Sequence, residues 1–249
     1  MKAVLLSAGQ GSRLLPLTND LPKCLLPVGN HTVLERQLET LDAASAFDEI
    51  VVVTGFHAQK VEESIERMTS LSTPVRTLFN PFYKVADNLA SCWMAREFMM
   101  EDFLIVNGDS LFEPSVLSCV LQGAKAPINL TINFKSNFDS DDMKVTLDGD
   151  KVLSVGKTIP LPSTHAESIG LVLFTKEGGA SFRNTLDASM RDNTGVNAWY
   201  LQIIDRLAKD GLVGAIDIGE REWGEIDYPS DLEEVRRLVS GWDRPRVVA

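Results

Sequence analysis

The sequence predicts an α/β protein with a doubly wound, mixed β-sheet, and three observations support this class. Short apolar segments alternate with helical segments through the first half, which is typical of a parallel sheet covered on both faces. A glycine-rich turn follows the first apolar segment. An Asp-Gly hairpin signal in the second half indicates antiparallel strands. We therefore expect a single domain over residues 1–249, in which residues 134–249 add antiparallel strands to the sheet of residues 1–133.

Buried strands are expected in the first half wherever a short apolar run ends at a polar or glycine residue. They cover Lys2–Ser7, Glu49–Thr54, Val75–Phe79 and Phe103–Asn107. Ligands of open α/β sheets bind outside the carboxyl ends of the parallel strands. We therefore expect the functional residues to follow these segments.

Helices are expected between these strands. Thr32 and Glu35 have the spacing of a capping box, which predicts a helix that begins after Thr32 and runs to about Ala44. The next two helices are expected at Ala58–Met68 and Leu89–Met100. The resulting βαβα order is that of a doubly wound fold.

The second half is expected to begin with a hairpin. Its strands are Met143–Leu147 and Lys151–Val155, joined by the Asp-Gly turn. Further strands are expected at Ile169–Thr175, Val213–Ile218 and Gly224–Asp227. Further helices are expected at Lys176–Leu186, Ala198–Lys209 and Ser230–Leu238, the last with Ser230 as its N-cap.

Composition and charge narrow the class of function. The chain has a formal net charge of −11 and no stripe of lysine and arginine, which argues against a nucleic-acid partner. No run approaches the ~20 apolar residues of a membrane span, and the first residues do not resemble a signal peptide. The three cysteines are widely separated in apolar surroundings, which indicates buried thiols in a cytoplasmic protein.

The first strand leads into a glycine-rich turn, Gly9-Gln10-Gly11-Ser12-Arg13-Leu14. It does not match the dinucleotide fingerprint, because Leu14 stands at the third glycine position, and it lacks the Gly-Lys-Ser/Thr of a P-loop. Backbone N–H groups and the forked guanidinium of Arg13 are groups that bind phosphate. Lys23 adds a second cation beside an apolar run. The alternative is that both cations are solvated residues of a loop.

Two acidic segments have the pattern of a metal site. Asp109 follows a buried strand and a glycine, and the run Gly-Glu-Ile-Asp-Tyr-Pro contains Glu225 and Asp227. A period of two places Glu225 and Asp227 on one face, with Ile226 behind them. Magnesium binds a triphosphate through one or two carboxylates, so we expect Asp109, Asp227 and Glu225 to bind Mg²⁺. The alternative is a turn aspartate and an aspartate near the start of a helix.

Polar and aromatic residues elsewhere are candidates for substrate contacts. Asn88 and Ser91 can form hydrogen bonds to a base edge, although capping of a helix is in general the commoner role for an asparagine at the position of Asn88. Trp199, Tyr200 and Trp223 are candidates for a pocket that binds a quaternary ammonium group such as choline. Core packing explains Trp199 and Tyr200 as well.

The run LSAGQGSRLLPLTNDLPKCLLPVGN, residues 6–30, resembles the signature of the nucleotidyltransferases that activate sugar 1-phosphates and related phosphate esters. The Gly-Asp at residues 108–109 and the Glu-Ile-Asp at residues 225–227 extend the resemblance. It implies a Rossmann-like fold of the nucleotide-diphospho-sugar transferase type, Mg²⁺ as cofactor, and transfer of a nucleoside monophosphate to a phosphorylated acceptor with release of pyrophosphate. The catalytic residues it implies are Arg13, Lys23, Asp109 and Asp227.

The resemblance also implies residues that bind the two substrates. The nucleotide-binding candidates are Ser7, Ala8, Gly9, Gln10, Gly11, Ser12, Arg13, Lys23, Thr54, Gly55, Asn88, Ser91 and Asp109. The acceptor-binding candidates that it implies are Lys144, Lys157 and Glu167. The aromatic residues Trp199, Tyr200 and Trp223 are added to them because of their chemistry alone. For Lys144, an ordinary surface lysine is an equal alternative.

The hairpin and the Trp-Gly-Glu-Ile-Asp-Tyr-Pro ending look closest to the phosphocholine cytidylyltransferase branch. This implies CTP as donor and phosphocholine, or a related phosphate ester or phosphonate, as acceptor. A sugar-1-phosphate nucleotidyltransferase that uses UTP, dTTP or GTP is the first alternative. A non-catalytic nucleotide-sensing protein and a dinucleotide-dependent oxidoreductase are alternatives of other classes, and the altered fingerprint disfavours the latter. A homodimer is left open.

Overall fold

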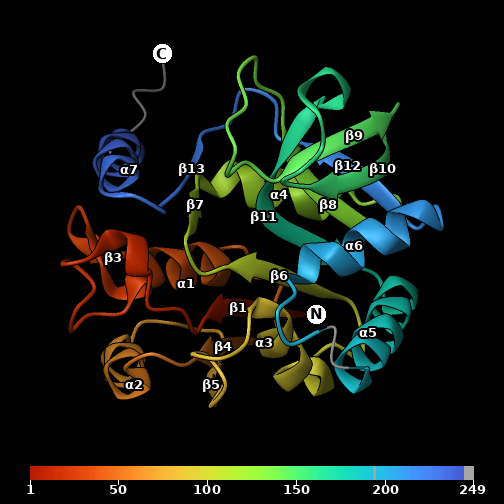
Figure 1. Cartoon of the computed structure of the whole chain (residues 1–249). Coiled ribbons are helices and arrows are strands. Elements are labelled where there is room, and N and C mark those ends of the chain that lie inside the picture. Colours follow the sequence, from red (N-terminus) through yellow and green to blue (C-terminus); the bar gives the residue numbers. More distant parts are fainter. Residues whose placement is uncertain (193–194, 244–249) are drawn as a thin grey trace.

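A nine-stranded mixed sheet forms the centre of the protein (Figure 1). The computed structural model describes residues 1–192 and 195–243. The strands of the sheet are β1 (Lys2–Ser7), β4 (Glu49–Thr54), β5 (Val75–Phe79), β6 (Phe103–Asn107), β8 (Ile128–Asn133), β9 (Lys144–Asp148), β10 (Lys151–Gly156), β11 (Ala166–Phe174) and β12 (Val213–Asp217). Their order is β5-β4-β1-β6-β11-β8-β12-β10-β9.

Strands β1, β4, β5 and β6 are parallel to one another and have the bounds expected from the sequence. Strand β1 pairs with β4 and with β6, so that Ser7 lies opposite Thr54 and Leu6 lies opposite Asn107. Strands β1, β4 and β6 are almost continuously apolar because both faces of the sheet are covered there. Strand β5 was also expected to be buried, but it is the edge strand and none of its residues is buried. The carboxyl ends of the four parallel strands therefore meet at one edge, where the loops that follow them come together.

The second half continues the sheet with antiparallel strands, as expected. Strand β11 pairs antiparallel with β6 and β8, and its register shifts between Ser168 and Val172. Gly170 lies within this irregularity at a φ of 81°, and a Cβ there would lie 2.7 Å from side-chain atoms of Asn107 and Ser110. Strand β9 pairs with both β10 and β11, so this end of the sheet curls back on itself. Strand β8 was not expected from the sequence.

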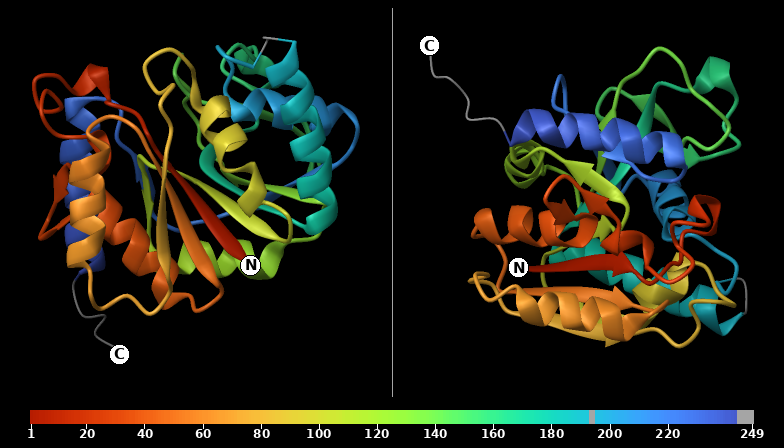
Figure 2. Two further views of the ribbon diagram at one scale, coloured as in Figure 1. Left: turned by 90° about the horizontal axis from the view of Figure 1, so that it is seen from below. Right: turned by 90° about the vertical axis from the view of Figure 1, so that its left-hand side faces the viewer.

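Helices cover both faces of the sheet (Figure 2). One face is covered by α1 (Val33–Ala43), α2 (Ala58–Arg67) and α4 (Pro114–Gly123). The other is covered by α3 (Asn88–Met94), α5 (Lys176–Arg191) and α6 (Tyr200–Lys209). None of the helices in the described part of the chain has the length and hydrophobicity of a membrane-spanning segment.

Each helix expected from the sequence is present, but several begin or end at other residues than expected. The capping box is present, since Thr32 Oγ1 accepts from the backbone N–H of Glu35 at 3.2 Å and Glu35 accepts from the N–H of Thr32 at 2.7 Å. The helix expected to reach Met100 ends at Met94 and gives way to a 3-10 turn. Helix α4 was missed, although a proline opens it.

The C-terminal helix and two short strands form a second, smaller core. Helix α7 (Pro229–Trp242) begins after Tyr228, so the expected N-cap, Ser230, lies inside it. Strands β7 (Ser110–Phe112) and β13 (Trp223–Glu225) form an antiparallel ribbon. The segment between β1 and α1 contains four short elements: the 3-10 turns η1 (Ser12–Leu14) and η2 (Lys23–Leu25) and the strands β2 (Pro27–Val28) and β3 (His31–Thr32). Leu14, Leu111 and Ile226 share this core with buried residues of α7. The packing brings the N-terminal loop against the C-terminal segment (Figure 1).

Candidate active site

The glycine-rich loop after β1 is held by bonds within the N-terminal segment. Gly11 has a left-handed φ of 75°, and a Cβ there would lie 2.9 Å from Cβ of Lys23. The hydroxyl of buried Thr18 donates to the carbonyl of Gly11 at 2.8 Å, and Gln10 Nε2 donates to the carbonyl of Thr18 at 3.1 Å. The loop is therefore packed directly on the stem of Lys23.

Three carboxylates meet beside this loop. Asp109 follows β6 and precedes β7, and the N–H of Ile226 donates to the carbonyl of Asp109 at 3.1 Å, in line with the β7–β13 pairing. One oxygen from each of Asp109, Glu225 and Asp227 lies within 4.8 Å of the others. Ile226 is fully buried behind them, as a period of two requires. The structure brings together the three carboxylates that the sequence analysis proposed as metal ligands.

The ammonium group of Lys23 lies between two of these carboxylates. Its Nζ is 2.8 Å from Asp109 Oδ2 and 2.6 Å from Asp227 Oδ1, and its side chain is only 12% exposed. Burial opposes the charge of Lys23, but the two aspartates more than offset this and raise its pKa above the ordinary value. Lys23 is therefore a charged, nearly buried partner of the carboxylates.

Glu225 has the opposite electrostatic surroundings. Its side chain is open to solvent on one side but surrounded elsewhere by protein atoms. This crowding, together with the negative charges of Asp109 and Asp227, raises the pKa of Glu225 to about 8. A divalent cation among the three carboxylates would lower the pKa again, because it favours the ionised form.

Two further cations border the carboxylates. Arg13 donates to Asp227 Oδ2 at 3.2 Å, and the ammonium of Lys157 lies 3.3 Å from Asp141 Oδ1. Lys157 also lies over the ring of Trp199, 5.0 Å from its centroid. Arg13 and Lys157 reach one cleft from opposite halves of the chain, and this cleft is lined by Asn88, Trp199 and the carboxylates.

Two residues that the sequence analysis did not select hold these groups in place. The amide of buried Gln37 in α1 donates to the carbonyls of Asn107 at 2.8 Å and Ser110 at 2.7 Å, and so fixes the turn that carries Asp109. Asp231 Oδ2 accepts from the backbone N–H of Asp227 at 2.9 Å. Gln37 was detectable as a polar residue on the apolar face of a predicted helix. Asp231 was detectable as an acid in the first turn of α7.

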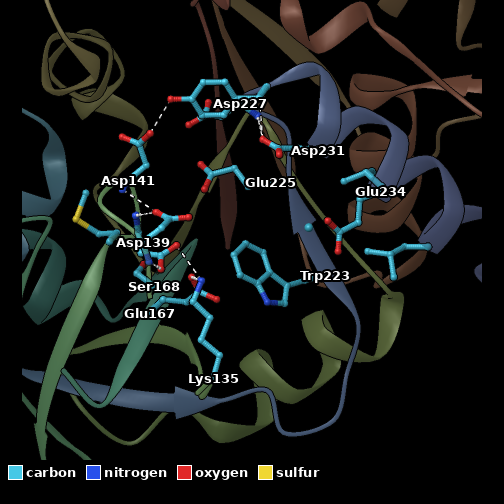
Figure 3. Close-up of a pocket in the computed structure, with 16 residues that line it drawn as sticks. Lys135, Asp139, Asp141, Glu167, Ser168, Trp223, Glu225, Asp227, Asp231 and Glu234 are labelled. Carbon is cyan, nitrogen blue, oxygen red and sulfur yellow. Dashed lines mark hydrogen bonds and ion pairs between the residues drawn. The ribbon is translucent and has the colours of Figure 1, made fainter. Parts of the chain in front are cut away.

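A cavity of about 310 Å³ adjoins the carboxylates, and Figure 3 shows its lining. The side chain of Trp223 lines this cavity together with Glu225. Lys135 and Glu167 also line it and form an ion pair with an Nζ–Oε2 distance of 2.5 Å. Burial raises the pKa of Glu167 despite its partner Lys135. Glu167 and Trp223, both predicted to contact the acceptor, line this cavity.

Two of the predicted acceptor residues point elsewhere, which corrects their assignment. Lys144 is 3% exposed, and its ammonium donates to the carbonyl of Lys157 at 3.1 Å. It therefore bonds to the backbone of a neighbouring segment and does not face the cleft. Tyr200 is fully buried, and its hydroxyl donates to Asn107 Oδ1 at 3.1 Å. In both cases the side chain points into the protein, where desolvation requires an internal hydrogen bond.

The remaining nucleotide-binding candidates divide into two groups. Ser7, Gly9, Asn88, Lys23 and Asp109 line a second cavity at the end of β1, and Ser12 is exposed on the loop. The others support this end of the sheet: Ala8, Thr54 and Ser91 are buried, Ser91 accepts from Asn80 Nδ2 at 3.0 Å, and Gly55 packs against the carbonyl of Ala8. The prediction of direct contact is therefore not supported for Thr54 and Ser91.

Comparison with protein families gives a match for the N-terminal half. The family described as "Nucleotidyl transferase" matches residues 2–137, more than half of the chain. The chain belongs to the nucleotidyl transferase family. The matched region includes the glycine-rich loop, Lys23 and Asp109, and it confirms the family that the sequence motif indicated.

Curated relatives of this nucleotidyl transferase family member match almost its whole length. The bifunctional IPC transferase and DIPP synthase of Rubrobacter xylanophilus is 28% identical over 96% of this chain and 52% of its own length. The CMP-5'-(3-aminopropyl)phosphonate synthase of Streptomyces rubellomurinus is 27% identical over 94% of this chain and 38% of its own. The CTP:phosphoglutamine cytidylyltransferase of Campylobacter jejuni is 24% identical over 94% and 98%. The chain thus spans about half or less of the first two relatives.

Solved structures confirm the fold. The inositol-1-phosphate CTP transferase from T. maritima superposes with a TM-score of 0.81 at 21% identity, over 100% of this chain and 97% of that chain. The CTP:phosphocholine cytidylyltransferase from Streptococcus pneumoniae gives a TM-score of 0.77 at 18% identity, over 96% and 98%. The doubly wound mixed sheet with its antiparallel addition is therefore the nucleotidyltransferase fold.

Proposed function

We propose that the chain is a Mg²⁺-dependent cytidylyltransferase, which transfers CMP from CTP to a small phosphorylated acceptor and releases pyrophosphate. The observation that supports this most is the convergence of Arg13, Lys23 and the carboxylates Asp109 and Asp227 at the end of the phosphate-binding loop. Phosphocholine, or a related phosphate ester or phosphonate, is the acceptor class. The names of two of these relatives include CMP or CTP, which supports CTP as the donor.

The proposed reaction needs no nucleophile from the protein. An oxygen of the acceptor's phosphate forms a bond to the α-phosphorus of the nucleotide while the bond to the pyrophosphate oxygen breaks. The loop's N–H groups, Arg13 and Lys23 hold the triphosphate, and Lys157 holds the acceptor phosphate. Positioning of the two reactants and stabilisation of the spreading negative charge supply the rate enhancement.

The carboxylates fit a magnesium ion. Asp109 Oδ1 is buried and lacks a hydrogen-bond partner in the described part of the chain, and Asp227 and Glu225 offer oxygens within 4.8 Å. Oxygen ligands of this kind are those that Mg²⁺ prefers. Asp109 and Asp227, with Glu225 beside them, would hold the ion, which supplies positive charge to the phosphate oxygens when bound.

Asn88 is placed to contact the nucleoside, but it does not discriminate between cytosine and uracil. Its Oδ1 accepts from the backbone N–H of Tyr200 at 3.0 Å. Asn88 lines the second cavity at the end of β1 and the cleft between Arg13 and Lys157. The amide NH₂ is therefore the group left to donate, and the carbonyl oxygens of cytosine and uracil both accept such a bond. The choice of CTP thus rests on the relatives and on the pattern of the second half.

A substrate screen tests the proposal. CTP, UTP, dTTP, GTP and ATP would each be mixed with phosphocholine, inositol 1-phosphate, an aminoalkylphosphonate and glucose 1-phosphate, and pyrophosphate release would be measured. We expect the highest kcat/KM with CTP and a non-sugar acceptor. Turnover of glucose 1-phosphate with UTP or dTTP, and none with CTP, would favour the sugar-nucleotide alternative. Absence of pyrophosphate release with every pair would support the nucleotide-sensing alternative.

Trp223 gives a test of the acceptor class. If the acceptor carries a quaternary ammonium group, Trp223→Ala should raise the acceptor's KM and leave the KM for CTP nearly unchanged, because the indole lines the cavity beside the carboxylates. Phe79→Ala, which removes an exposed ring at the end of the edge strand β5, is the control for loss of an aromatic side chain. Equal KM values for phosphocholine in wild type and Trp223→Ala would exclude this role.

A further inference from the structure

The carboxylate of Asp141 lies where three donors of the cleft converge. Arg13 Nη2 is 3.5 Å and Lys157 Nζ is 3.3 Å from Asp141 Oδ1, and the hydroxyl of Tyr228 donates to Asp141 Oδ2 at 2.8 Å. Arg13 follows β1, Lys157 follows β10, and Tyr228 precedes α7. One acidic side chain therefore joins three segments that are far apart in the sequence.

The loop that carries Asp141 is held in a definite shape. This loop, residues 134–143, connects β8 to β9. Asp139 Oδ1 accepts from the backbone N–H groups of Asp141 at 2.7 Å and Asp142 at 3.0 Å, and Lys135 pairs with Asp142 at 2.8 Å. Figure 3 shows Asp141 at the edge of the cavity near Asp227. The turn projects the Asp141 carboxylate into the cleft.

The surrounding donors are those of a phosphate site. A forked guanidinium, an ammonium and a hydroxyl on one anion are the groups that bind phosphate oxygens in proteins. The guanidinium of Arg13 lies 5.2 Å from the ring centroid of Tyr228, which keeps the arginine beside the tyrosine hydroxyl. The hydrogen bond from Tyr228 and the charges of Lys157 and Arg13 lower the pKa of Asp141, so Asp141 is an anion at neutral pH.

We propose that Asp141 is an internal substitute for a substrate phosphate group, which displaces it, and that the hydroxyl of Tyr228 then donates to a phosphate oxygen. The proposal rests on the proposed function for the role of Arg13 and Lys157. It adds Tyr228 as a phosphate-binding residue and the loop 134–143 as a latch. In the unliganded protein the latch keeps the cations of the cleft neutralised. Binding of phosphate displaces the Asp141 carboxylate from Arg13, Lys157 and Tyr228.

The test measures binding, so that it does not depend on turnover. Inorganic pyrophosphate represents the nucleotide's phosphates and methyl phosphate represents the acceptor's phosphate. Their Kd values would be determined by isothermal titration calorimetry, with a chelator present to remove divalent metal. Asp141→Asn keeps the side-chain shape and removes the competing charge. Glu234→Gln removes one negative charge from the same cavity at a residue that does not contact Arg13 or Lys157.

We expect Asp141→Asn to bind at least one probe about fivefold more tightly than wild type, since a solvent-exposed ion pair is worth up to roughly 1 kcal/mol. Glu234→Gln should change both Kd values less. Tighter binding of pyrophosphate alone in Asp141→Asn assigns the site to the nucleotide. Tighter binding of methyl phosphate alone assigns it to the acceptor. Unchanged Kd values for both probes, or the same gain in Glu234→Gln, would overturn the latch.

Tyr228 is tested in the Asp141→Asn variant. In this variant the hydroxyl of Tyr228 is no longer bonded to a carboxylate, so phosphate binding does not have to break that bond. Addition of Tyr228→Phe should weaken binding of the affected probe by about tenfold, because a hydrogen bond to a charged group contributes roughly 1.5 kcal/mol or more. An unchanged Kd would remove Tyr228 from the site. Circular dichroism spectra and unfolding midpoints of all variants control for the fold. A chain that binds phosphate in this way but transfers no nucleotide would refute the proposed function and leave the latch intact.

Discussion

Lys23 and Asp227 form an ion pair of 2.6 Å across 204 residues of sequence. The same ammonium group is 2.8 Å from Asp109 Oδ2, so it lies between two of the three carboxylates that fit a metal ion. Without this cation, Asp109, Glu225 and Asp227 would repel one another at close range. Lys23 thus connects the glycine-rich loop to the carboxylates, and its position leads to the expectations below.

Loss of either paired aspartate should abolish most of the transfer activity. In Asp109→Asn and Asp227→Asn we expect turnover to fall by about 10²-fold or more, the scale seen when one stabilising group of a reaction centre is removed. Binding of Mn²⁺, followed by electron paramagnetic resonance, should weaken in both. Glu220→Gln, an exposed change outside the cleft, is the control. Wild-type turnover and Mn²⁺ binding in either aspartate variant would contradict the assignment.

Replacement of Lys23 should separate catalysis from binding. Lys23→Ala removes charge that acts mainly on the transition state, so kcat should fall more than the apparent affinity for the nucleotide. Arg13→Lys should also lower kcat, because an ammonium cannot make the forked contact of a guanidinium. Steady-state kinetics with both substrates varied would check this. If both variants kept the wild-type kcat, these cations would be ordinary loop residues.

The position of Lys23 also predicts competition with metal in the absence of nucleotide. The ammonium and a divalent cation would occupy the same space between Asp109 and Asp227. Lys23→Met should therefore bind Mn²⁺ more tightly than wild type when no nucleotide is present, by about tenfold if one close charge is removed. Weaker or equal binding would show that Lys23 and the metal do not compete.

Two neighbouring glycines should respond differently to alanine. Gly11→Ala places a side chain at a left-handed φ and 2.9 Å from Lys23, so we expect a loss of about 1–2 kcal/mol in the free energy of unfolding and a lower kcat. In Gly9→Ala the new Cβ has nothing within 4 Å, so the stability should be unchanged. Urea unfolding of both variants measures the difference. Equal stabilities would mean that the loop adapts without strain.

Gln37 should be needed for both stability and activity although it is remote from the substrates. Gln37→Leu leaves the carbonyls of Asn107 and Ser110 without the amide that they bind, so we expect a loss of about 1–3 kcal/mol in the free energy of unfolding. The kcat should fall because the turn with Asp109 is released. Glu39→Gln, an exposed change on the same helix, is the control. An unchanged kcat in Gln37→Leu would limit its role to stability.

The parallel half of the sheet could be predicted from the sequence because its signals are local. Strands β1, β4 and β6 are short apolar runs with clear ends, and burial on both faces leaves each pattern unambiguous. The edge strand β5 is only half-buried to exposed, but its bounds were also predicted correctly. The capping box at Thr32 is equally local. Strand β8, with the sequence INLTIN, was missed because polar residues interrupt it.

Trp199 and Tyr200 show where sequence reasoning reaches its limit. The two aromatic residues are adjacent and were equal candidates for the acceptor pocket. Trp199 is 36% exposed and lies beside Lys157, whereas Tyr200 is fully buried and bonded to Asn107. Trp199 precedes α6 and Tyr200 is its first residue, and only the packing of that helix on the sheet decides which of the two side chains faces solvent.

The sequence by itself determined the family and the parallel strands, because strand patterns and the loop motif are encoded within a few dozen residues. The tertiary structure alone decided that Lys23 lies between Asp109 and Asp227, and that Asp141 lies between Arg13 and Lys157. It also turned Lys144 away from the cleft. These arrangements depend on the pairing of β7 with β13 and on the path of the loop 134–143. Contacts between segments so distant in the chain are set by the packing of the whole fold, and local sequence patterns do not predict that packing.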